Sequence, residues 1–520
     1  MRLRSYRRIV MTDVPPVPRL CSALFALALF AFPGRGSAQS RTDSVPLDPE
    51  RSLALALDAN PTLRAAFFDA VASRADATAA ENARVPTLTM SSQGQYSESI
   101  GGTANGANRT RGWSVVSSAA LSTTTEVGTV LSVTLGSTTQ WRQAGLTPGV
   151  TTVVTIGPTY SGSATVSARQ PLLRGRGRDA VLSDQRQAEA RALAAEADAD
   201  VATSQLVRDV LVAYWELWYA DRAAIVQREA AALAAQQSSL ATQRRSLGTL
   251  SPADALQFVT AEASLREQVA SAEAARTTRA VTFARLLALD PSTARTIAID
   301  GSEPTPVESP PLSLVVERLR TLSPQIRSLE ADIEAAQAAA IGARATARPR
   351  LDATGSAGVA GLWMDDSYQG LSLPGGRPAL VASVGLELEL PIVADRARAQ
   401  RDAAAAQLDA AEARLAAATA ELEAGVVAKL ATLESAAASA TLTTETARVA
   451  GELAEAERRR LELGTSTPTV LLDAQQTARE SRLRHDRALV DAQVASLQLD
   501  HDAGFLLDRF HASVSSGVAP

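Results

Sequence analysis

Two long stretches without proline limit most strongly what this chain can fold into. They run from about Asp179 to Ser246 and from about Ala394 to Glu462. Because proline interrupts helices, each stretch predicts one continuous helix. At 1.5 Å per residue, such a helix spans roughly 100 Å, far more than a helix of an ordinary globular domain.

A coiled-coil seam runs along the second of these stretches. Apolar residues there recur at steps of three and four, the spacing of a heptad pattern. Alanine at alternate seam positions allows close helix approach, and it accounts for much of the 46% hydrophobic content, whereas aromatic residues make up only 4%. This composition favours thin sheets of helices over the three or four compact domains that 520 residues would otherwise suggest. The seam consists of Leu408, Ala411, Leu415, Ala418 and Leu422.

Two shorter helices are predicted beside the first long one. They cover Pro49–Ala83 and Pro252–Leu289. Together they are about as long as the long helix. Two short helices stacked end to end can therefore pair with one long helix along its length.

The chain contains two copies of one plan. Three short motifs recur in the same order, and the spacing from Pro171 to Gly248 nearly equals that from Pro391 to Gly464. We expect a first helix–strand–helix repeat over 49–295 with strands at about 86–169, a linker at 296–312, and a second repeat over 313–507 with strands at about 349–391. The first repeat is longer than the second in its strand-rich part. The motif pairs are Asn60-Pro61-Thr62-Leu63 with Ser323-Pro324-Gln325-Ile326, Gln170-Pro171-Leu172-Leu173 with Leu390-Pro391-Ile392-Val393, and Leu247–Pro252 with Leu463–Pro468.

The segments between the helices alternate apolar and polar residues. Val384, Leu386 and Leu388 alternate with Gly385, Glu387 and Glu389, which is the period of a strand with one apolar and one polar face. Any one such strand fits a sandwich. Long runs with a polar face suit a lipid-facing barrel with a wet interior better. Two strand pairs per chain are too few to close a barrel, so several chains must contribute.

The N-terminus has the order of a secretory signal peptide. Four arginines between Arg2 and Arg8 precede an apolar stretch from Leu20 to Phe32 and the small residues Gly36-Ser37-Ala38. We predict a signal peptide at 1–38 and an N-terminal extension at 39–48, with an N-terminal anchor helix as the alternative for the first segment. Cleavage would change the net charge from −5 to −10, because six arginines and one aspartate leave. It would also remove Cys21, the only cysteine.

The composition and the absence of certain motifs argue against several classes of protein. One cysteine cannot form a disulfide scaffold, and an acidic chain gives no support for nucleic-acid binding. Past residue 40 no apolar run approaches the ~20 residues of a membrane-spanning helix. His485, His501 and His511 lack metal-ligand spacing, and no phosphate loop, nucleophile elbow or HExxH motif occurs. We therefore expect that the protein has no metal site, binds no cofactor and is not an enzyme.

These features together resemble the outer membrane efflux protein family, the TolC-like exit ducts. The motifs that carry the resemblance extend over about residues 47–507, essentially the whole chain after the predicted signal peptide. Each motif alone is weak, and their order within a duplicated plan is specific. They are Ala56-Leu57 with Asn60-Pro61-x-Leu63, Gln170–Gly175, Gly248-Thr249-x-Ser251 with Asp254, and Leu463-Gly464-Thr465 with Asp473-Ala474.

The resemblance implies a mainly α protein with a membrane β-barrel. In such a protein a long coiled-coil α-helical barrel is continuous with a trimeric 12-stranded outer-membrane β-barrel, to which each chain gives four strands and two internal repeats. It implies a homotrimer in outer membrane lipid of a Gram-negative-type bacterium, extending into the periplasm. The partners would be a periplasmic adaptor (membrane fusion) protein and an inner-membrane pump of RND or ABC type, with no nucleic acid.

The first repeat departs from this plan because it has more strand candidates than expected. They lie at about 86–98, 113–121, 129–137 and 159–169. The extra hairpin could be a longer extracellular loop or an equatorial addition. A C-terminal tail is expected at 508–520.

Two helix-to-helix turns are the expected adaptor-docking tips. In the resembled family such tips meet the adaptor at the periplasmic end, where small residues permit close backbone contact. The alternative is an ordinary helical-hairpin turn, in which glycine ends one helix and Ser or Thr caps the next. The tip residues are Leu247, Gly248, Thr249, Leu250 and Ser251 in the first turn, and Leu463, Gly464, Thr465, Ser466 and Thr467 in the second.

Carboxylates near the tips are the expected pore gate. The resemblance implies that Asp473 joins a ring of three that narrows the pore and sets its selectivity, with Asp254 as a second candidate. Val470 stands where the family has an outer acidic residue, and Ser466 replaces an arginine that pairs with the residue matching Asp254, so that salt bridge cannot form. The alternative for both aspartates is a helix N-terminal charge favoured by the dipole.

The barrel lumen is the expected location of Glu387 and Glu389. The alternative for both glutamates is that they lie at exposed strand ends. Tyr214, Trp215 and Trp218, on the first long helix, are expected to be helix-packing anchors rather than a ligand stack.

The sequence therefore predicts a passive outer-membrane exit duct of a tripartite efflux or type I secretion system. It would conduct substrates from an inner-membrane pump across the periplasm and the outer membrane. The alternative is a soluble periplasmic coiled-coil adaptor or scaffold, although adaptors usually carry one helical hairpin rather than two full-length repeats. The exported substrate is set mostly by the pump.

Overall fold

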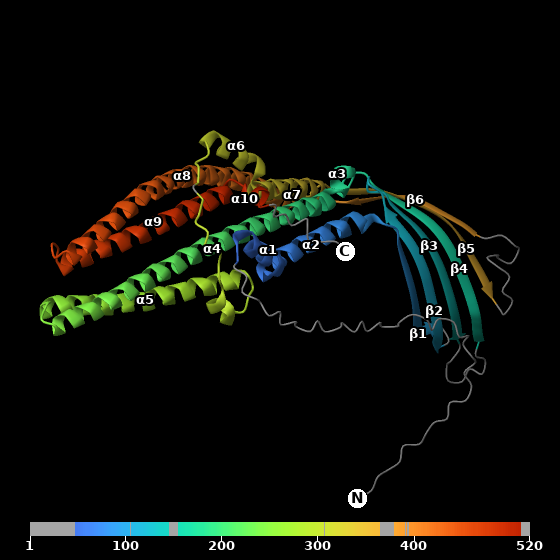
Figure 1. The fold of residues 1–520 in the computed structure, drawn as a ribbon. Coiled ribbons are helices and arrows are strands. Elements are labelled where there is room, and N and C mark those ends of the chain that lie inside the picture. Colours follow the sequence, from blue (N-terminus) through green and yellow to red (C-terminus); the bar gives the residue numbers. More distant parts are fainter. Residues whose placement is uncertain are drawn as a thin grey trace, which may run out of the picture. The chain divides into compact units, whose positions relative to one another are not determined.

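The computed structural model describes residues 47–103, 106–144, 154–305, 307–364, 379–390, 392 and 395–510 (Figure 1). The predicted signal peptide at 1–38 lies outside the described residues. So do most of the N-terminal extension, residues 39–46, and the end of the tail, residues 511–520.

The same order of elements occurs twice along the chain. Helices lead into strands, the strands lead into a very long helix, and a shorter helix returns. The first half contains α1 (Pro49–Ala59), α2 (Pro61–Glu81), η1 (Asn82–Arg84), β1 (Thr87–Thr103), β2 (Gly106–Thr124), β3 (Val130–Ala144), β4 (Val154–Pro171), α3 (Arg178–Val181), α4 (Ser183–Ser246), α5 (Pro252–Leu286) and η2 (Pro291–Thr296). The second half contains α6 (Leu312–Leu322), α7 (Pro324–Thr346), β5 (Arg350–Met364), β6 (Ala379–Glu389), α8 (Asp395–Glu462), α9 (Pro468–Asp502) and α10 (Leu506–Arg509).

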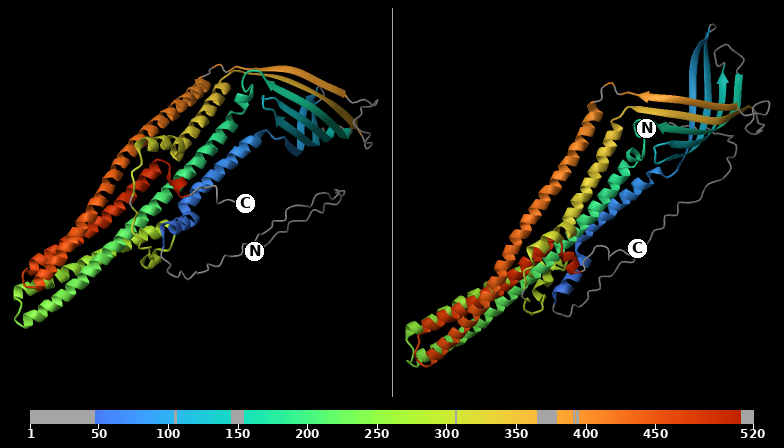
Figure 2. Two further views of the ribbon diagram at one scale, coloured as in Figure 1. Left: turned by 45° about the horizontal axis from the view of Figure 1, so that its top comes forward. Right: turned by 90° about the horizontal axis from the view of Figure 1, so that it is seen from above.

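The two long helices form the frame of a thin helical layer. The structure confirms both as continuous, with 64 residues in α4 and 68 in α8. α4 packs against α2 and α5 and also against α7 and α9, and α8 packs against α7 and α9. Figure 2 shows α8, α7, α4 and α2 side by side. All five residues of the predicted seam on α8 are buried or half-buried, as expected for a packing seam. None of the helices in the described part of the chain combines the length and apolar character needed to cross a membrane.

The predicted helix over Pro49–Ala83 is in fact two helices, which meet at Asn60. The Asn60 carboxamide oxygen accepts hydrogen bonds from the backbone N–H groups of Thr62 (2.9 Å) and Leu63 (3.2 Å), so it caps α2. Its Nδ2 donates to the carbonyl of Leu286, at the end of α5, at 3.0 Å. One buried side chain thus starts α2 and satisfies a terminal carbonyl of α5. The predicted end-to-end arrangement of α2 and α5 beside α4 is therefore held by this junction.

The corresponding junction of the second half uses a close backbone approach instead. Ser323 precedes α7 but makes no side-chain capping bond. The turn after α9 contacts it through Gly504, where an added Cβ would lie 3.0 Å from both the Ser323 nitrogen and the Leu322 carbonyl carbon. Glycine is required there for space and for its φ of +77°.

The strands form one antiparallel sheet in the order β1-β2-β3-β4-β5-β6. The expectation of four strands per chain was wrong, because the first half supplies four strands and the second half two. The additional hairpin of the first half is part of this sheet. All four strands of the first half are hydrogen-bonded into the sheet that contains β5 and β6. The pairing continues from β4 to β5, for example Val166 with Ala357, so the two halves meet within the sheet.

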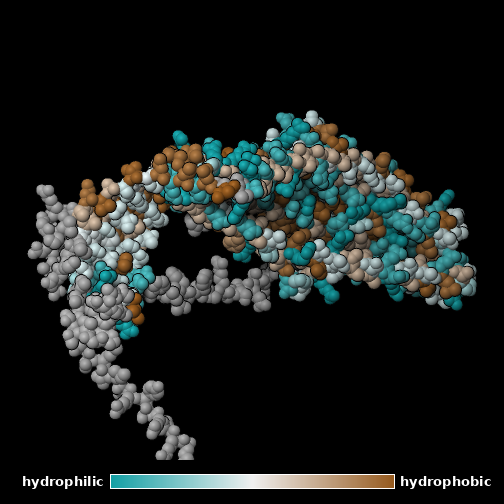
Figure 3. Space-filling model, turned by 180° about the vertical axis from the view of Figure 1, so that it is seen from behind, coloured by the Kyte–Doolittle hydropathy of each residue, from teal (hydrophilic) through white to brown (hydrophobic). Residues whose placement is uncertain are grey.

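The sheet has one apolar and one polar face. Leu88, Leu121, Val133 and Val166 follow one another across β1 to β4 on the apolar face. Their side chains are exposed, as is that of Val384 on β6 at 94%. Figure 3 shows hydrophobic side chains gathered on one side of the sheet. The other face carries hydroxyl pairs that hydrogen-bond across neighbouring strands: Ser91 with Ser118, Ser132 with Ser167, and Ser356 with Ser383.

An apolar core lies where α1, α4, α5 and η2 meet. Tyr214 and Trp218 on α4 are almost completely buried, and Tyr214 packs edge-on against Phe283 of α5. Burial raises the pKa of the Tyr214 hydroxyl to about 12. The prediction that these aromatic residues are packing anchors is confirmed.

Candidate gating and docking tips

The two predicted tips have the same backbone geometry. Both lie at the end of the helices away from the sheet (Figure 1). Gly248 and Gly464 have φ values of +74° and +75°, and each donates its N–H to the residue three positions earlier, at 3.0 and 3.1 Å. The next residues, Thr249 and Thr465, donate both their N–H and their hydroxyl to the carbonyl five positions earlier. Glycine is required because the helix ends in a left-handed residue.

The first tip is closed by a cap on the following helix. The Ser251 hydroxyl accepts a hydrogen bond from the Asp254 N–H at 3.1 Å and donates to the Asp254 carboxylate at 2.8 Å. Pro252 stands at the first helical position, where its missing N–H costs nothing. This reciprocal cap gives Asp254 a structural role within its own hairpin.

The second tip contains a functional candidate that the sequence did not indicate. Glu457 on α8 is only 6% exposed, and it accepts hydrogen bonds from the Ser466 hydroxyl at 2.7 Å and from Arg460 at 2.8 Å. The hydrogen bond from Ser466 has the largest effect on the Glu457 carboxyl, followed by the bond from Arg460. Together they hold the pKa of this carboxyl below its usual range. Ser466 therefore bonds within its own hairpin, at the position where the resembled ducts have arginine. No local pattern relates residues 457 and 466, because the turn that brings them together lies between them.

A polar and an apolar contact join the two hairpins near the tips. The Thr469 hydroxyl on α9 donates to the Gln257 carboxamide oxygen on α5 at 3.0 Å. Beside it, Phe258 of α5 is 7% exposed and belongs to a small apolar cluster drawn from both hairpins. The other members are Leu250, Ala241, Ala255, Leu461 and Leu472.

Asp473 lies on the exposed side of α9. Leu471 and Ala474 are buried against the neighbouring helices, whereas Val470 and Asp473, three residues apart, share the exposed face. Within the described residues the Asp473 carboxylate forms no ion pair or hydrogen bond. The structure therefore leaves this charge free to face another chain or a lumen, and no hydrogen bond or ion pair among the described residues links it to Asp254.

Glu387 and Glu389 lie on the polar face of the sheet, at its helix-proximal end. Arg350 on β5 is 2.8 Å from Asp352, 3.7 Å from Glu387 and 3.3 Å from Glu389. Arg174, after β4, is 3.8 Å from Glu389. The two glutamates therefore belong to a charged network at the junction between sheet and helices.

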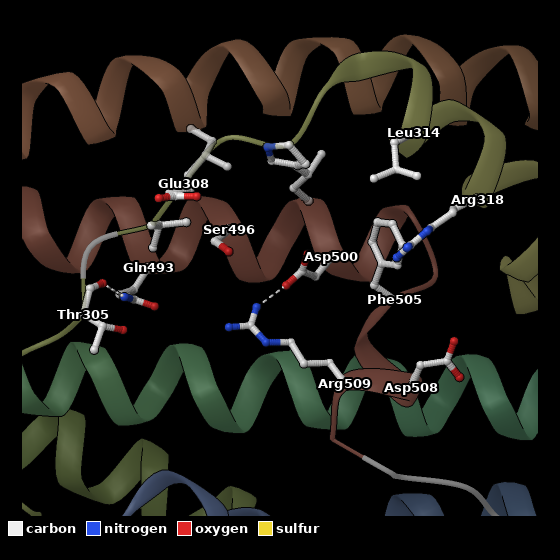
Figure 4. Close-up of a pocket in the computed structure, with 14 residues that line it drawn as sticks. Thr305, Glu308, Leu314, Arg318, Gln493, Ser496, Asp500, Phe505, Asp508 and Arg509 are labelled. Carbon is white, nitrogen blue, oxygen red and sulfur yellow. Dashed lines mark hydrogen bonds and ion pairs between the residues drawn. The ribbon is translucent and has the colours of Figure 1, made fainter.

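A separate cavity of about 570 Å³ lies between α6, α9 and the chain after α9 (Figure 4). Asp500 and Arg509 form an ion pair of 2.5 Å across it, and the Arg318 guanidinium lies 4.7 Å from the centre of the Phe505 ring. Burial raises the pKa of the Asp500 carboxyl, which Arg509 partly offsets. Asp500 and Arg509 thus neutralise each other within this cavity. In the part of the chain that the structure describes, no group of His, Cys, Asp and Glu side chains could hold a metal ion.

Residues 315–504, from α6 through α9, match the sequence family described as outer membrane efflux protein. In this part the chain is similar to the outer membrane efflux protein family. The resemblance predicted from the sequence is thereby confirmed. No curated protein matches the chain in sequence.

Solved structures share the fold over most of the chain. A membrane protein from Pseudomonas aeruginosa is 22% identical with a TM-score of 0.64, over 89% of this chain and 95% of that one. The CmeC outer membrane channel from Campylobacter jejuni is 13% identical with a TM-score of 0.65, over 88% and 85%. The outer membrane protein VceC from Vibrio cholerae is 16% identical with a TM-score of 0.64, over 88% and 96%.

Proposed function

We propose that this protein is the outer-membrane exit duct of a tripartite efflux or type I secretion system. The observation that carries the proposal is the sheet, with an exposed apolar face for lipid and a serine- and threonine-rich face for a wet lumen. It leads directly into two helical hairpins, each with a helix of roughly 100 Å. A soluble adaptor would have no use for a broad exposed apolar sheet face. The family match and the shared fold support the same conclusion.

In this function three copies form a homotrimer built from a duplicated chain. The matching turns at Gly248 and Gly464, and the repeated order of helices and strands, support duplication into repeats at 49–295 and 313–507. The helical layers of three chains would enclose a periplasmic tunnel. An energised inner-membrane pump of RND or ABC type and a periplasmic adaptor would complete the path, and the duct itself would be passive.

The site residues take roles that follow from their location. The tips Leu247–Ser251 and Leu463–Thr467 would meet the adaptor, since they end the hairpins farthest from the membrane. Asp473 would form a ring of three at the tip, with Asp254 behind its cap as the weaker candidate. Glu387 and Glu389 would line the lumen where barrel and tunnel join.

Cell fractionation and gel migration test the proposal directly. Expressed in a Gram-negative host, the protein should be extracted from the outer membrane as a trimer that converts to monomer only on heating. The purified trimer should form pores in a planar bilayer. A monomer in the soluble periplasmic fraction would refute the duct and favour the adaptor or scaffold.

A further inference from the structure

The additional hairpin of the first half is placed in the sheet like the other strands. We propose that all six strands of each chain cross the outer membrane, so that three copies close an 18-stranded barrel rather than a 12-stranded one. This inference rests on the trimer of the proposed function. It adds a transmembrane hairpin to each chain and assigns the edges that join neighbouring copies.

A row of aromatic residues crosses the sheet at one level. The register aligns Tyr96 on β1 with Trp113 on β2, and Trp113 with Trp141 on β3. Tyr160 on β4 pairs with Thr139, two residues from Trp141, and its partner on β5 is Trp363. Three of the five tryptophans in the chain thus stand in one row. The Tyr96, Trp113 and Trp141 side chains are 48%, 59% and 41% exposed on the apolar face.

Such a row is the girdle with which barrels mark a membrane interface. The surface on its two sides supports that assignment. Between the row and the helices the apolar face carries residues such as Met90, Leu121 and Leu135. Beyond the row the same face becomes charged, where Glu98 and Arg109 form an ion pair of 2.9 Å. The change from apolar to charged takes place at the aromatic row.

The height of the apolar band matches that of a membrane. Tyr96 stands nine residues after Thr87, where β1 leaves the helical side. At ~3.3 Å per residue and a tilt of ~40°, this is about 23 Å along the membrane normal, against ~25 Å for the apolar band of outer-membrane barrels. Because the row runs from β1 through β3 to β5, the strands of the first half lie at the same depth as those of the second. A loop outside the membrane would not share this level.

The two sheet edges are suited to a second copy of this chain. Among the residues that the structure describes, β1 and β6 each have one neighbour, which leaves an unpaired edge on both sides of the sheet. In lipid such an edge is prohibitively costly, so the sheet must close. β1 runs away from the helices and β6 returns to them, so β1 of one copy meets β6 of the next as an antiparallel pair. An even number of strands per chain makes that pairing possible around a rotation axis.

A wider barrel is the consequence of the additional hairpin. At equal tilt the diameter grows roughly in proportion to strand number, so 18 strands give about 1.5 times the diameter of 12 and roughly twice the cross-section. The duct would then be narrow only at the tips.

Lipid contact of single labelled cysteines tests the inference. Replacement of Cys21 by Ser leaves the chain without cysteine. Bimane would be attached to Ala119→Cys on β2 and Leu135→Cys on β3, both on the apolar face, in trimers reconstituted with phosphatidylcholine brominated on its acyl chains. Ser118→Cys and Thr134→Cys, on the polar face one residue away, are the matched controls, and Val384→Cys on β6 is the reference.

The pattern of quenching separates the inference from the proposed function. We expect bimane at Ala119→Cys and Leu135→Cys to lose as much fluorescence as at Val384→Cys, about twofold, with little loss at the two controls. Quenching at Val384→Cys alone would overturn the 18-stranded barrel and leave the duct intact. Absence of quenching at Val384→Cys as well would overturn both. Electron microscopy of the trimer in nanodiscs gives an independent count, and 12 strands in the membrane would also overturn the inference.

Discussion

Ala288 is the only non-glycine residue, among those the structure describes, with a positive φ, 55°. It ends α5 by donating its N–H to the Arg285 carbonyl at 3.1 Å, as Gly504 does with His501 after α9. Alanine in this left-handed region costs about 1–2 kcal/mol. We expect Ala288→Gly to stabilise each chain by about 0.5–1 kcal/mol, because relief of strain exceeds the added freedom of the unfolded chain.

Gly504→Ala is the opposite change at the corresponding turn. Its Cβ would meet the backbone of Leu322 and Ser323, so we expect a loss of more than about 2 kcal/mol. The temperature at which the trimer dissociates on a gel measures both variants. A lower dissociation temperature for Ala288→Gly would contradict the assignment of strain.

His501 gives the helical layer a defined sensitivity to acid. The pKa of the imidazole is lowered to about 4, mainly by burial and further by the nearby positive charges of Arg208 and Lys429. The Nδ1 atom of His501 lies 2.7 Å from the Ser204 hydroxyl. The folded chain therefore keeps the ring neutral at pH values where the unfolded chain, with a pKa of about 6.5, is protonated. Stability contributed by the neutral ring should fall as the pH drops from about 6.5 to about 4, by up to ~3 kcal/mol per chain.

His501→Gln should remove this part of the acid sensitivity. Urea unfolding of the detergent-extracted protein at pH 7.5, 6 and 4.5 would measure it. Ser204→Ala removes a hydrogen-bond partner but no titrating group, so it should lower stability at each pH and retain the slope. An unchanged slope in His501→Gln would exclude the histidine as its source.

A side-chain hydrogen bond links the two hairpins near the tips. Thr469 on α9 donates to Gln257 on α5, and loss of such a bond costs about 0.5–1.5 kcal/mol. If three chains of the proposed trimer open together, Thr469→Val should increase the open fraction about tenfold or more. Single-channel recording in planar bilayers would show longer or larger openings.

Thr249→Val is the matched control for that experiment. Within the described part of the chain, the Thr249 hydroxyl bonds only to the Arg244 carbonyl of its own turn, at 3.0 Å. We expect this variant to conduct like the natural protein. Equal effects of the two variants would mean that the tip responds to any loosened turn rather than to the contact between hairpins.

Elements were predictable where one local signal dominated. The absence of proline fixed both long helices, and Gly248 and Gly464 marked their ends. The junction at Asn60 was missed although Asn before Pro is a helix-start signal, because the apolar pattern continues across it. The contact of Ser466 with Glu457 had no comparable signal, since it depends on the geometry of the intervening turn.

Two features of the whole sheet, its aromatic row and its number of strands, could not be predicted from the single strands. Alternation predicted a polar and an apolar face, but Tyr96, Trp113 and Trp141 lie far apart along the chain, at unequal spacings. Only the strand register places them in one row. The number of strands per chain was likewise taken from a family resemblance, and pairing within the sheet raised it from four to six.

The charge on the exposed face of α9 should decide which ions pass the proposed trimer. Asp473 has no partner among the described residues, whereas Asp254 is bonded to Ser251. Three carboxylates in a ring favour cations and hold divalent blockers. Asp473→Arg should therefore reverse or abolish cation selectivity in planar bilayers and remove block by divalent cations.

Asparagine variants separate the two carboxylates by the same chemical change. Asp473→Asn should lower the cation-to-anion permeability ratio several-fold, whereas Asp254→Asn should mainly weaken the cap of α5 and leave selectivity nearly unchanged. Selectivity and block that survive Asp473→Arg would show that the ring lies elsewhere. A loss confined to Asp254→Asn would instead assign the ring to the first tip, with its capping bond broken in the assembled pore.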